Sequence, residues 1–197
     1  MGRPKNFEPD VAVAQAMETF WSQGYAGTSP ADLAEATGVG KGSLYHTFGS
    51  KRELFGKALD LYGQAGSELT EECLNEPGST AKGRIRAYLR FMVDTDLSGP
   101  VRRGCLAANT ALELGNSDPE AAVAVRAMTN ETIRLLTERL RRGQRDGDVA
   151  PEVDADAQAH FLMNTIVGLR VMARTHEGPV LHGIIESALA GFLPRHA

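Results

Sequence analysis

The chain has 197 residues, of which 42% are hydrophobic and 23% charged, and its formal net charge is −4. This composition is that of a globular protein and excludes a disordered chain, while two cysteines are too few for a disulfide scaffold. The negative net charge argues against a protein that coats nucleic acid without selectivity. We expect a cytoplasmic location, because the sequence has neither an apolar run long enough to span a membrane nor a signal peptide.

Helical patterns follow one another along the chain. In the first of them Val13, Met17 and Phe20 recur at three- and four-residue spacing, which places them on one helix face. Ser29 followed by Pro30 predicts the start of the second helix, and glycines and prolines separate the later ones. No strand pattern and no internal repeat stand out. We therefore predict an all-α fold with helices at about 10–23, 30–37, 41–48, 51–74, 79–96, 101–115, 118–145, 154–176 and 179–193.

Residues 25–55 form the segment that points to a function. Two short helices joined by a glycine-containing turn predict a helix-turn-helix. Leu44 and Phe48, four residues apart, fit the buried face of the second helix, while Leu33 and Val39 fit the buried side of the first helix and of the turn. The N-terminal end of the second helix is the end that contacts base edges in such motifs. The residues expected to face outward there are Lys41, Gly42, Ser43, Tyr45, His46 and Thr47.

Basic residues gather locally in this segment. Residues 38–57 hold four Lys or Arg, namely Lys41, Lys51, Arg52 and Lys57, against the single acid Glu53. A DNA site here would thus be a small patch and not a basic domain. Farther upstream, Arg3 and Lys5 fit either a flexible arm that reaches a groove or an unstructured start, and the sequence favours neither.

The segment from about Val11 to Leu59 closely resembles the TetR family of bacterial transcriptional repressors. The resemblance implies an all-α homodimer that binds a palindromic operator in double-stranded DNA and responds to a small-molecule effector, without a cofactor. It implies a helix-turn-helix domain at 1–50 and a ligand-binding and dimerisation domain at 51–197, with dimerisation through the helices at 154–176 and 179–193. The matching positions include Phe20, Gly24, Tyr25, Thr28, Ser29, Leu33, Ala34, Gly38, Val39, Gly42, Leu44, Tyr45, Phe48, Ser50, Lys51, Leu54 and Phe55.

The resemblance also assigns roles within the helix-turn-helix. Base edges would be approached by Lys41, Gly42 and Ser43, with Gly42 contributing close backbone approach. Phosphate or sugar would be contacted by Tyr45 and His46, and Tyr45 could also reach a base. Ala31 stands where some relatives carry a long base-reading side chain, so little readout is expected there. The residues suited to phosphate near helix starts are Thr28, Ser29 and Lys51.

The effector site follows from the family layout alone. Its expected occupant is a small apolar or aromatic molecule. The candidates are Tyr62, Phe91, Met92, Cys105, Asn109, Leu112, Met128, Phe161, Met163, Thr165 and Met172. Residues of these types are more often part of the core than in contact with a ligand. Cys105 follows Arg102 and Arg103 and resembles a cysteine in a family branch with sensors of electrophiles or oxidants, but it can also be a small residue that packs.

Other functions have less support in the sequence. The run from Gly38 to Ser43 lacks the spacing of a nucleotide-binding loop, and the histidines lack the spacing of metal ligands. No set of residues suggests catalysis, so we do not expect an enzyme. Two alternatives remain open: a helical small-molecule-binding protein or enzyme with a vestigial N-terminal domain, and an architectural protein that binds DNA without sequence preference.

Overall fold

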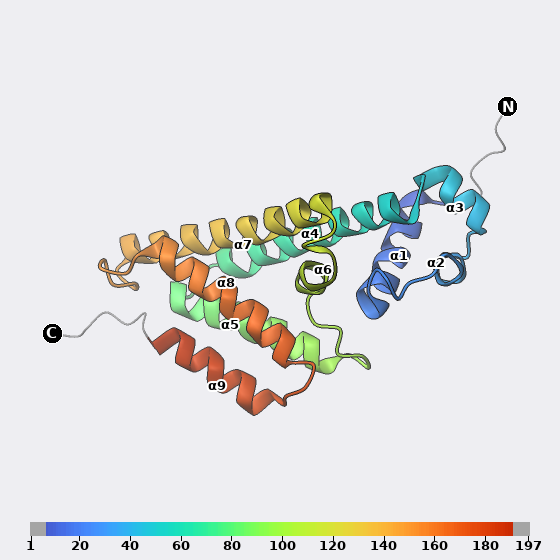
Figure 1. Cartoon of the computed structure of the whole chain (residues 1–197). Helices are drawn as coiled ribbons and strands as arrows, with labels where there is room; N and C mark the ends of the chain where they lie inside the picture. Colours follow the sequence, from blue (N-terminus) through green and yellow to red (C-terminus); the bar gives the residue numbers. More distant parts are fainter. Residues whose placement is uncertain (1–6, 191–197) are drawn as a thin grey trace. The chain divides into compact units, whose positions relative to one another are not determined.

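The computed structural model describes residues 7–190. Over that range the chain is all-α, as predicted, and no strand is present (Figure 1). Arg3, Lys5 and the end of the helix predicted at 179–193 lie outside the described residues. The helices are α1 (Pro9–Gln23), α2 (Pro30–Thr37), α3 (Lys41–Phe48), α4 (Lys51–Asn75), α5 (Ala81–Ser98), α6 (Leu106–Leu114), α7 (Pro119–Asp146), α8 (Ala155–Met172) and α9 (Gly178–Leu189).

Short polar side chains cap several of the helices at their N-termini. The hydroxyl of Ser29 accepts a hydrogen bond from the Asp32 amide, and the Asp32 carboxylate accepts one from the Ser29 amide, so α2 begins with a capping box. Ser50 caps α4 by accepting from the Glu53 amide at 3.1 Å. Asp118 caps α7 by accepting from the Ala121 amide at 2.9 Å. These caps explain why the predicted and observed starts of these three helices agree to within one residue.

The chain divides into two compact units, which we call the N-terminal unit (Met1–Ala65 and Leu106–Val125) and the C-terminal unit (Gly66–Cys105 and Arg126–Ala197). Helices α4 and α7 each begin in the first and continue into the second. The boundary expected at residue 50 therefore falls inside the N-terminal unit. That unit also contains α6 and the first residues of α7, which are part of the ligand-binding domain predicted at 51–197.

An aromatic and aliphatic core holds the N-terminal unit together. Phe20 of α1 and Phe55 of α4 are at most 1% exposed, and their rings meet edge to face with centroids 4.9 Å apart. Leu33 and Leu44, both 0% exposed, bring α2 and α3 onto this core. The pattern that predicted these buried positions is thereby confirmed, and the opposite face of α3 is left for other contacts.

The C-terminal unit is built around α5, α8 and α9, which pack on one another. Its buried core includes Ile85, Leu89, Leu136, Leu162 and Ile185, each 0% exposed. A buried ion pair lies at one edge of this core. Arg170 of α8 donates from Nε and Nη2 to the two carboxylate oxygens of Asp96 on α5, both at 2.9 Å, and from Nη2 to the Gly104 carbonyl at 2.9 Å.

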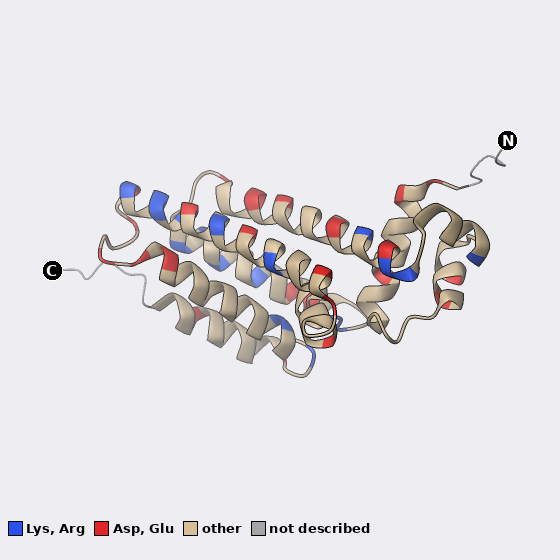
Figure 2. Ribbon diagram, turned by 45° about the horizontal axis from the view of Figure 1, so that its top comes forward, with Lys and Arg blue, Asp and Glu red and all other residues tan. Residues whose placement is uncertain are grey.

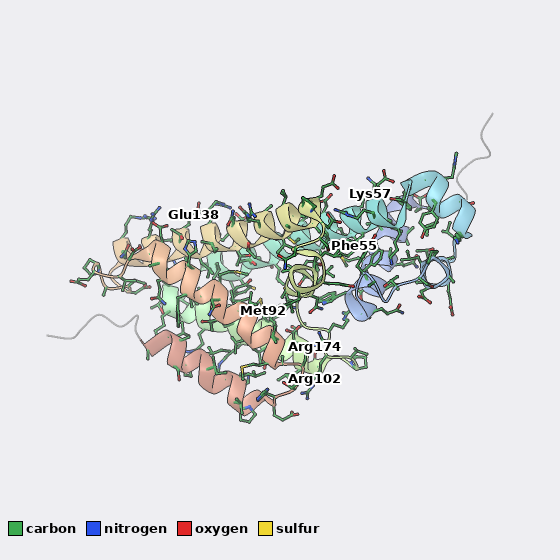
Figure 3. All side chains as sticks on the ribbon, in the orientation of Figure 1. Phe55, Lys57, Met92, Arg102, Glu138 and Arg174 are labelled. Carbon is green, nitrogen blue, oxygen red and sulfur yellow. The ribbon has the colours of Figure 1, made fainter. Side chains whose placement is uncertain are left out.

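Two predicted helix boundaries are wrong by several residues. The helix expected at 101–115 begins only at Leu106, because Gly104 adopts φ +67°, a left-handed conformation that an α-helix does not accommodate. The helix expected at 154–176 ends at Met172. Arg102, labelled in Figure 3, then hydrogen-bonds to the His176 carbonyl at 3.1 Å and to the Glu177 carboxylate. Both boundaries depend on contacts made across the fold, which local sequence patterns do not contain.

Candidate nucleic-acid interface

The outer face of α3 carries the most accessible of the predicted DNA contacts. Lys41, Gly42, Ser43 and His46 are all exposed. Leu44, on the inner face, is 0% exposed, and Phe48 is 6% exposed. Because buried side chains hold α3 from behind, its exposed residues are presented on a fixed helix face and not on a loop.

The N-terminus of α3 has no side-chain cap. Its N-cap residue is Gly40, which provides no side chain to cap the first amides of the helix. A Cβ atom added at Gly42 would meet no protein atom within 4 Å, so the packing of the protein does not require a glycine there. A glycine at an exposed position of a helix lowers its stability, and close approach of another molecule would explain why it is present.

The two residues predicted to bind phosphate at the start of α2 differ in exposure. Ser29 is exposed, and its hydroxyl already accepts the capping hydrogen bond, which leaves its own proton free to be donated. Thr28 is 0% exposed, and its hydroxyl donates to the Gly24 carbonyl at 2.7 Å. The prediction for Thr28 is therefore corrected: this side chain is committed to the turn between α1 and α2 and cannot reach a phosphate from there.

Tyr45 and Thr47 are only half-buried, although both were expected to face outward. The Tyr45 hydroxyl is buried and has no hydrogen-bond partner among the described residues. Burial raises the pKa of this phenol, so it remains protonated and able to donate. A contact between Tyr45 and DNA would require the side chain to turn outward from this position.

Lys51, at the start of α4, lies against an aromatic ring. Its ammonium is 4.3 Å from the centroid of the Tyr25 ring, which is a cation–π distance. The Tyr25 ring also packs against Phe20 and Phe55, at 6.1 and 4.9 Å between centroids. Figure 2 shows basic and acidic positions interspersed along the ribbon, so the basic character of α3 and early α4 is local, as the sequence indicated.

Two acids that were not predicted from the sequence connect α6 and the start of α7 to the α1–α2 turn and to α4. Glu113 of α6 accepts hydrogen bonds from the Tyr25 amide at 2.9 Å and the Ala26 amide at 2.6 Å. Asp118 accepts two hydrogen bonds from Arg52, one of them at 2.7 Å from Nη2. The Arg52 guanidinium lowers the pKa of Asp118, and the Asp118 carboxylate raises that of Arg52. The acid in the last turn of α6 was the only local signal, since acids are disfavoured at that end of a helix.

The predicted effector-binding residues are divided between the two units. Phe91, Leu112 and Phe161 are 45%, 83% and 48% exposed, and their assignment to the effector site stays a prediction. Tyr62, Asn109 and Leu112 belong to the N-terminal unit, and Tyr62 meets Trp21 edge to face at 5.0 Å. Within the C-terminal unit, half-buried side chains pack against the core at Met92, Met163 and Met172 (Met92 is labelled in Figure 3).

The remaining candidates of the C-terminal unit are Cys105, Met128 and Thr165. Cys105 is half-buried and directly precedes α6, and Met128 of α7 is also half-buried. Thr165 is 9% exposed, and its hydroxyl donates to the Phe161 carbonyl at 2.9 Å. That intrahelical bond uses the hydroxyl proton, so Thr165 can only accept a hydrogen bond from a ligand.

Comparison with known protein families decides what this fold is. Residues 12–58 match the model of the bacterial regulatory proteins of the tetR family, and residues 81–184 match that of the tetracyclin repressor-like C-terminal domain. The chain belongs to the TetR family. This is a family of transcriptional regulators and not of enzymes, as the sequence predicted.

Individual TetR relatives match over almost the whole chain. The HTH-type transcriptional repressor ComR of Escherichia coli is 31% identical over 95% of this chain and 88% of its own length. The regulator YezE of Bacillus subtilis is 32% identical over 88% and 90%. Among solved structures, a cysteine mutant of the TetR regulator CifR, complexed with 26-bp double-strand operator DNA, has a TM-score of 0.83 and 35% identity, covering 97% of this chain and all of that one.

Two further features concern the described residues 7–190 only. None of their helices has the length and apolar character needed to cross a membrane. Nor do they contain a group of three or more His, Cys, Asp or Glu side chains placed to hold a metal ion.

Proposed function

We propose that this TetR-family chain is a transcriptional repressor that binds a palindromic operator as a homodimer and is released by a small, largely apolar molecule. The observation that carries DNA binding is the outer face of α3, where Lys41, Ser43 and His46 are exposed while Leu44 and Phe48 hold the helix from behind. The similarity to CifR, solved on its operator, supports the same use of this face.

Two lysines at different places in the proposed interface have different roles. Lys41 stands at the start of α3, where side chains reach base edges, and Lys51 lies at the start of α4, where phosphate is the natural partner. Base contacts discriminate between sequences, whereas phosphate contacts strengthen binding to every sequence. The two lysines therefore predict different losses when each is removed.

Selection of binding sites from a random duplex library at about 150 mM salt tests this proposal, because that salt concentration suppresses binding through phosphates alone. An enriched inverted repeat with half-sites about 34–36 Å apart, or a multiple of that spacing, is expected. Lys41→Ala should weaken binding to the operator more than binding to random duplex, whereas Lys51→Ala should weaken binding to both alike. Lys82→Ala of α5 is the control. A folded, dimeric protein that enriches no common sequence would favour the small-molecule-binding alternative.

The proposed dimer uses an apolar face of α8 and α9. Phe161 and Val171 of α8 and Val180 of α9 are 48%, 45% and 49% exposed in the protomer. Helix α8 is apolar around most of its circumference, and a helix of that kind is stable only when it is covered on all sides. Burial against a second copy removes this apolar surface from water.

Sedimentation equilibrium of two matched variants tests the dimer. Val171→Glu would place a charge in the proposed interface and should shift the protein toward the monomer. Val123→Glu makes the same change at a residue of α7 that is 62% exposed and outside the proposed interface, and should leave the dimer intact. Dissociation by both variants, or by neither, would contradict the assignment of the interface.

The effector site is proposed for the C-terminal unit near Met92, Met163 and Met172, whose flexible side chains pack against its core. A ligand releases DNA only if it binds the released state more tightly than the DNA-bound state. A thermal-shift screen of small apolar and aromatic molecules, followed by operator release, would identify it. If Cys105→Ser is released by the same molecule at the same concentration, the thiol is not the switch.

A further inference from the structure

The turn between α1 and α2 is held by a side chain that is distant in the sequence. Glu113 of α6 places one carboxylate oxygen 2.9 Å from the Tyr25 amide and the other 2.6 Å from the Ala26 amide. These pairs are separated by 88 and 87 residues. Hydrogen bonds from amides to a carboxylate are charge-assisted, and two of them to one side chain fix its orientation as well as its distance.

Glu113 occupies a position that α6 by itself disfavours. It is the second-last residue of α6, where the carboxylate faces the negative end of the helix dipole. Gly24 adopts φ +79°, and a Cβ atom there would lie 3.2 Å from the nearer carboxylate oxygen. The pair of hydrogen bonds explains the acid at the end of α6, because local rules are broken where a specific contact compensates for them. Gly24 is the C-cap residue of α1, and its amide donates to the Phe20 carbonyl.

Tyr25, in the turn that Glu113 contacts, packs against Lys51, which is a predicted phosphate contact. The ring of Tyr25 packs against Phe20 and Phe55, and the Lys51 ammonium lies 4.3 Å from the centroid of that ring. The backbone of Tyr25 thus connects two groups within the N-terminal unit: the Glu113 carboxylate on its amide and the Lys51 ammonium on its ring.

We propose that Glu113 is a positioning residue for DNA binding, which fixes the α1–α2 turn so that Tyr25 presents Lys51 to the phosphate backbone. The inference rests on the proposed function and deepens it. Glu113 does not touch DNA in this role, and its effect is carried by the position of Lys51.

Whether removal of Glu113 lowers or raises the affinity for DNA distinguishes the positioning role from a purely electrostatic effect of its charge. DNA is a polyanion, so removing a carboxylate from a DNA-binding unit should by charge alone leave its affinity unchanged or raise it. The positioning role predicts the opposite, a loss of affinity on removal of Glu113. Glu35 of α2 is an exposed acid of the same unit and provides the matched control.

The experiment measures the dissociation constants of the full-length protein for its selected operator and for random duplex. Glu113→Ala should raise both by about tenfold, which corresponds to one strong hydrogen bond. Glu113→Asp keeps the charge but withdraws the carboxylate by one methylene, and it should raise both constants as well. Glu35→Ala should leave both unchanged or lower them. Binding by Glu113→Ala as tight as that of the wild type would overturn the proposal.

A double-mutant cycle with Lys51→Ala tests the route through that lysine. If Glu113 acts by positioning Lys51, then Glu113→Ala should change the dissociation constant less than about twofold in the Lys51→Ala background. A full tenfold loss in that background would refute the route. Thermal unfolding of each variant checks that the N-terminal unit is folded. If Glu113→Ala does not fold, Glu113→Asp takes its place in the test. Failure of the wild type to select an operator would instead count against the proposed function, whatever the Glu113 variants do.

Discussion

Replacing Asp96 by alanine is expected to lower the free energy of unfolding by about 3–5 kcal/mol, because it leaves the Arg170 guanidinium buried without its charged partner. The Arg170 side chain is 14% exposed and that of Asp96 is 6% exposed. Two hydrogen bonds of 2.9 Å join them and would be lost, while the one from Arg170 to the Gly104 carbonyl would remain. For a chain of this size the loss corresponds to a fall in Tm of roughly 6–20 °C.

The assay is urea unfolding followed by circular dichroism at one fixed protein concentration, since the proposed dimer would make stability depend on concentration. Asp156→Ala is the control, because its ion pair with Arg141 has side chains 61% and 54% exposed and should contribute less than about 1 kcal/mol. The double variant Asp96→Leu with Arg170→Met removes both charges and should lose much less than Asp96→Ala alone. A loss of unfolding free energy below about 1 kcal/mol for Asp96→Ala would refute the reasoning. So would a double variant whose loss equals the sum of the losses of its two single variants.

Three further predictions concern single positions. Leu136→Ala should lower the free energy of unfolding by about 2–5 kcal/mol in the same urea assay, because Leu136 is 0% exposed. Gly104→Ala should lower Tm, since residue 104 has φ +67° and the new Cβ would lie 2.9 Å from the Arg170 carbonyl oxygen; an unchanged Tm would contradict this. Asp118 has a lowered pKa in the folded state, so its ion pair stabilises the protein above about pH 4 and is lost as the pH falls further. Asp118→Asn should therefore reduce the dependence of stability on pH below about pH 4, measured by acid unfolding.

Sequence patterns predicted those features of the fold that neighbouring residues determine. The spacing of Leu44 and Phe48 gave the buried face of α3, and Ser29 with Pro30 gave the start of α2. Thr28 was misplaced because a hydroxyl before a helix fits either a phosphate or the preceding turn, and only the fold shows that it donates to the Gly24 carbonyl.

Features that depend on contacts between residues far apart in the chain could not be predicted from local sequence patterns. The carboxylate of Glu113 meets an amide 88 residues away, and no local pattern pairs the two. Phe161 was assigned to the effector site from the family layout alone, and no local pattern predicted that its side chain is 48% exposed. The sequence pattern of α8 showed that the helix must be covered, but not by which chain.

The discontinuity of the N-terminal unit has a consequence for how the protein is made. Arg52 and Asp118 are 66 residues apart in the chain, so at about 5–20 residues per second the ribosome adds the second about 3–13 seconds after the first. For most of that interval the newly made helix-turn-helix lacks the carboxylates of both Glu113 and Asp118, because Glu113 is added only shortly before Asp118. A fragment that stops at residue 65 would stay in this incomplete state, whereas one that extends through residue 125 would contain every segment of the unit.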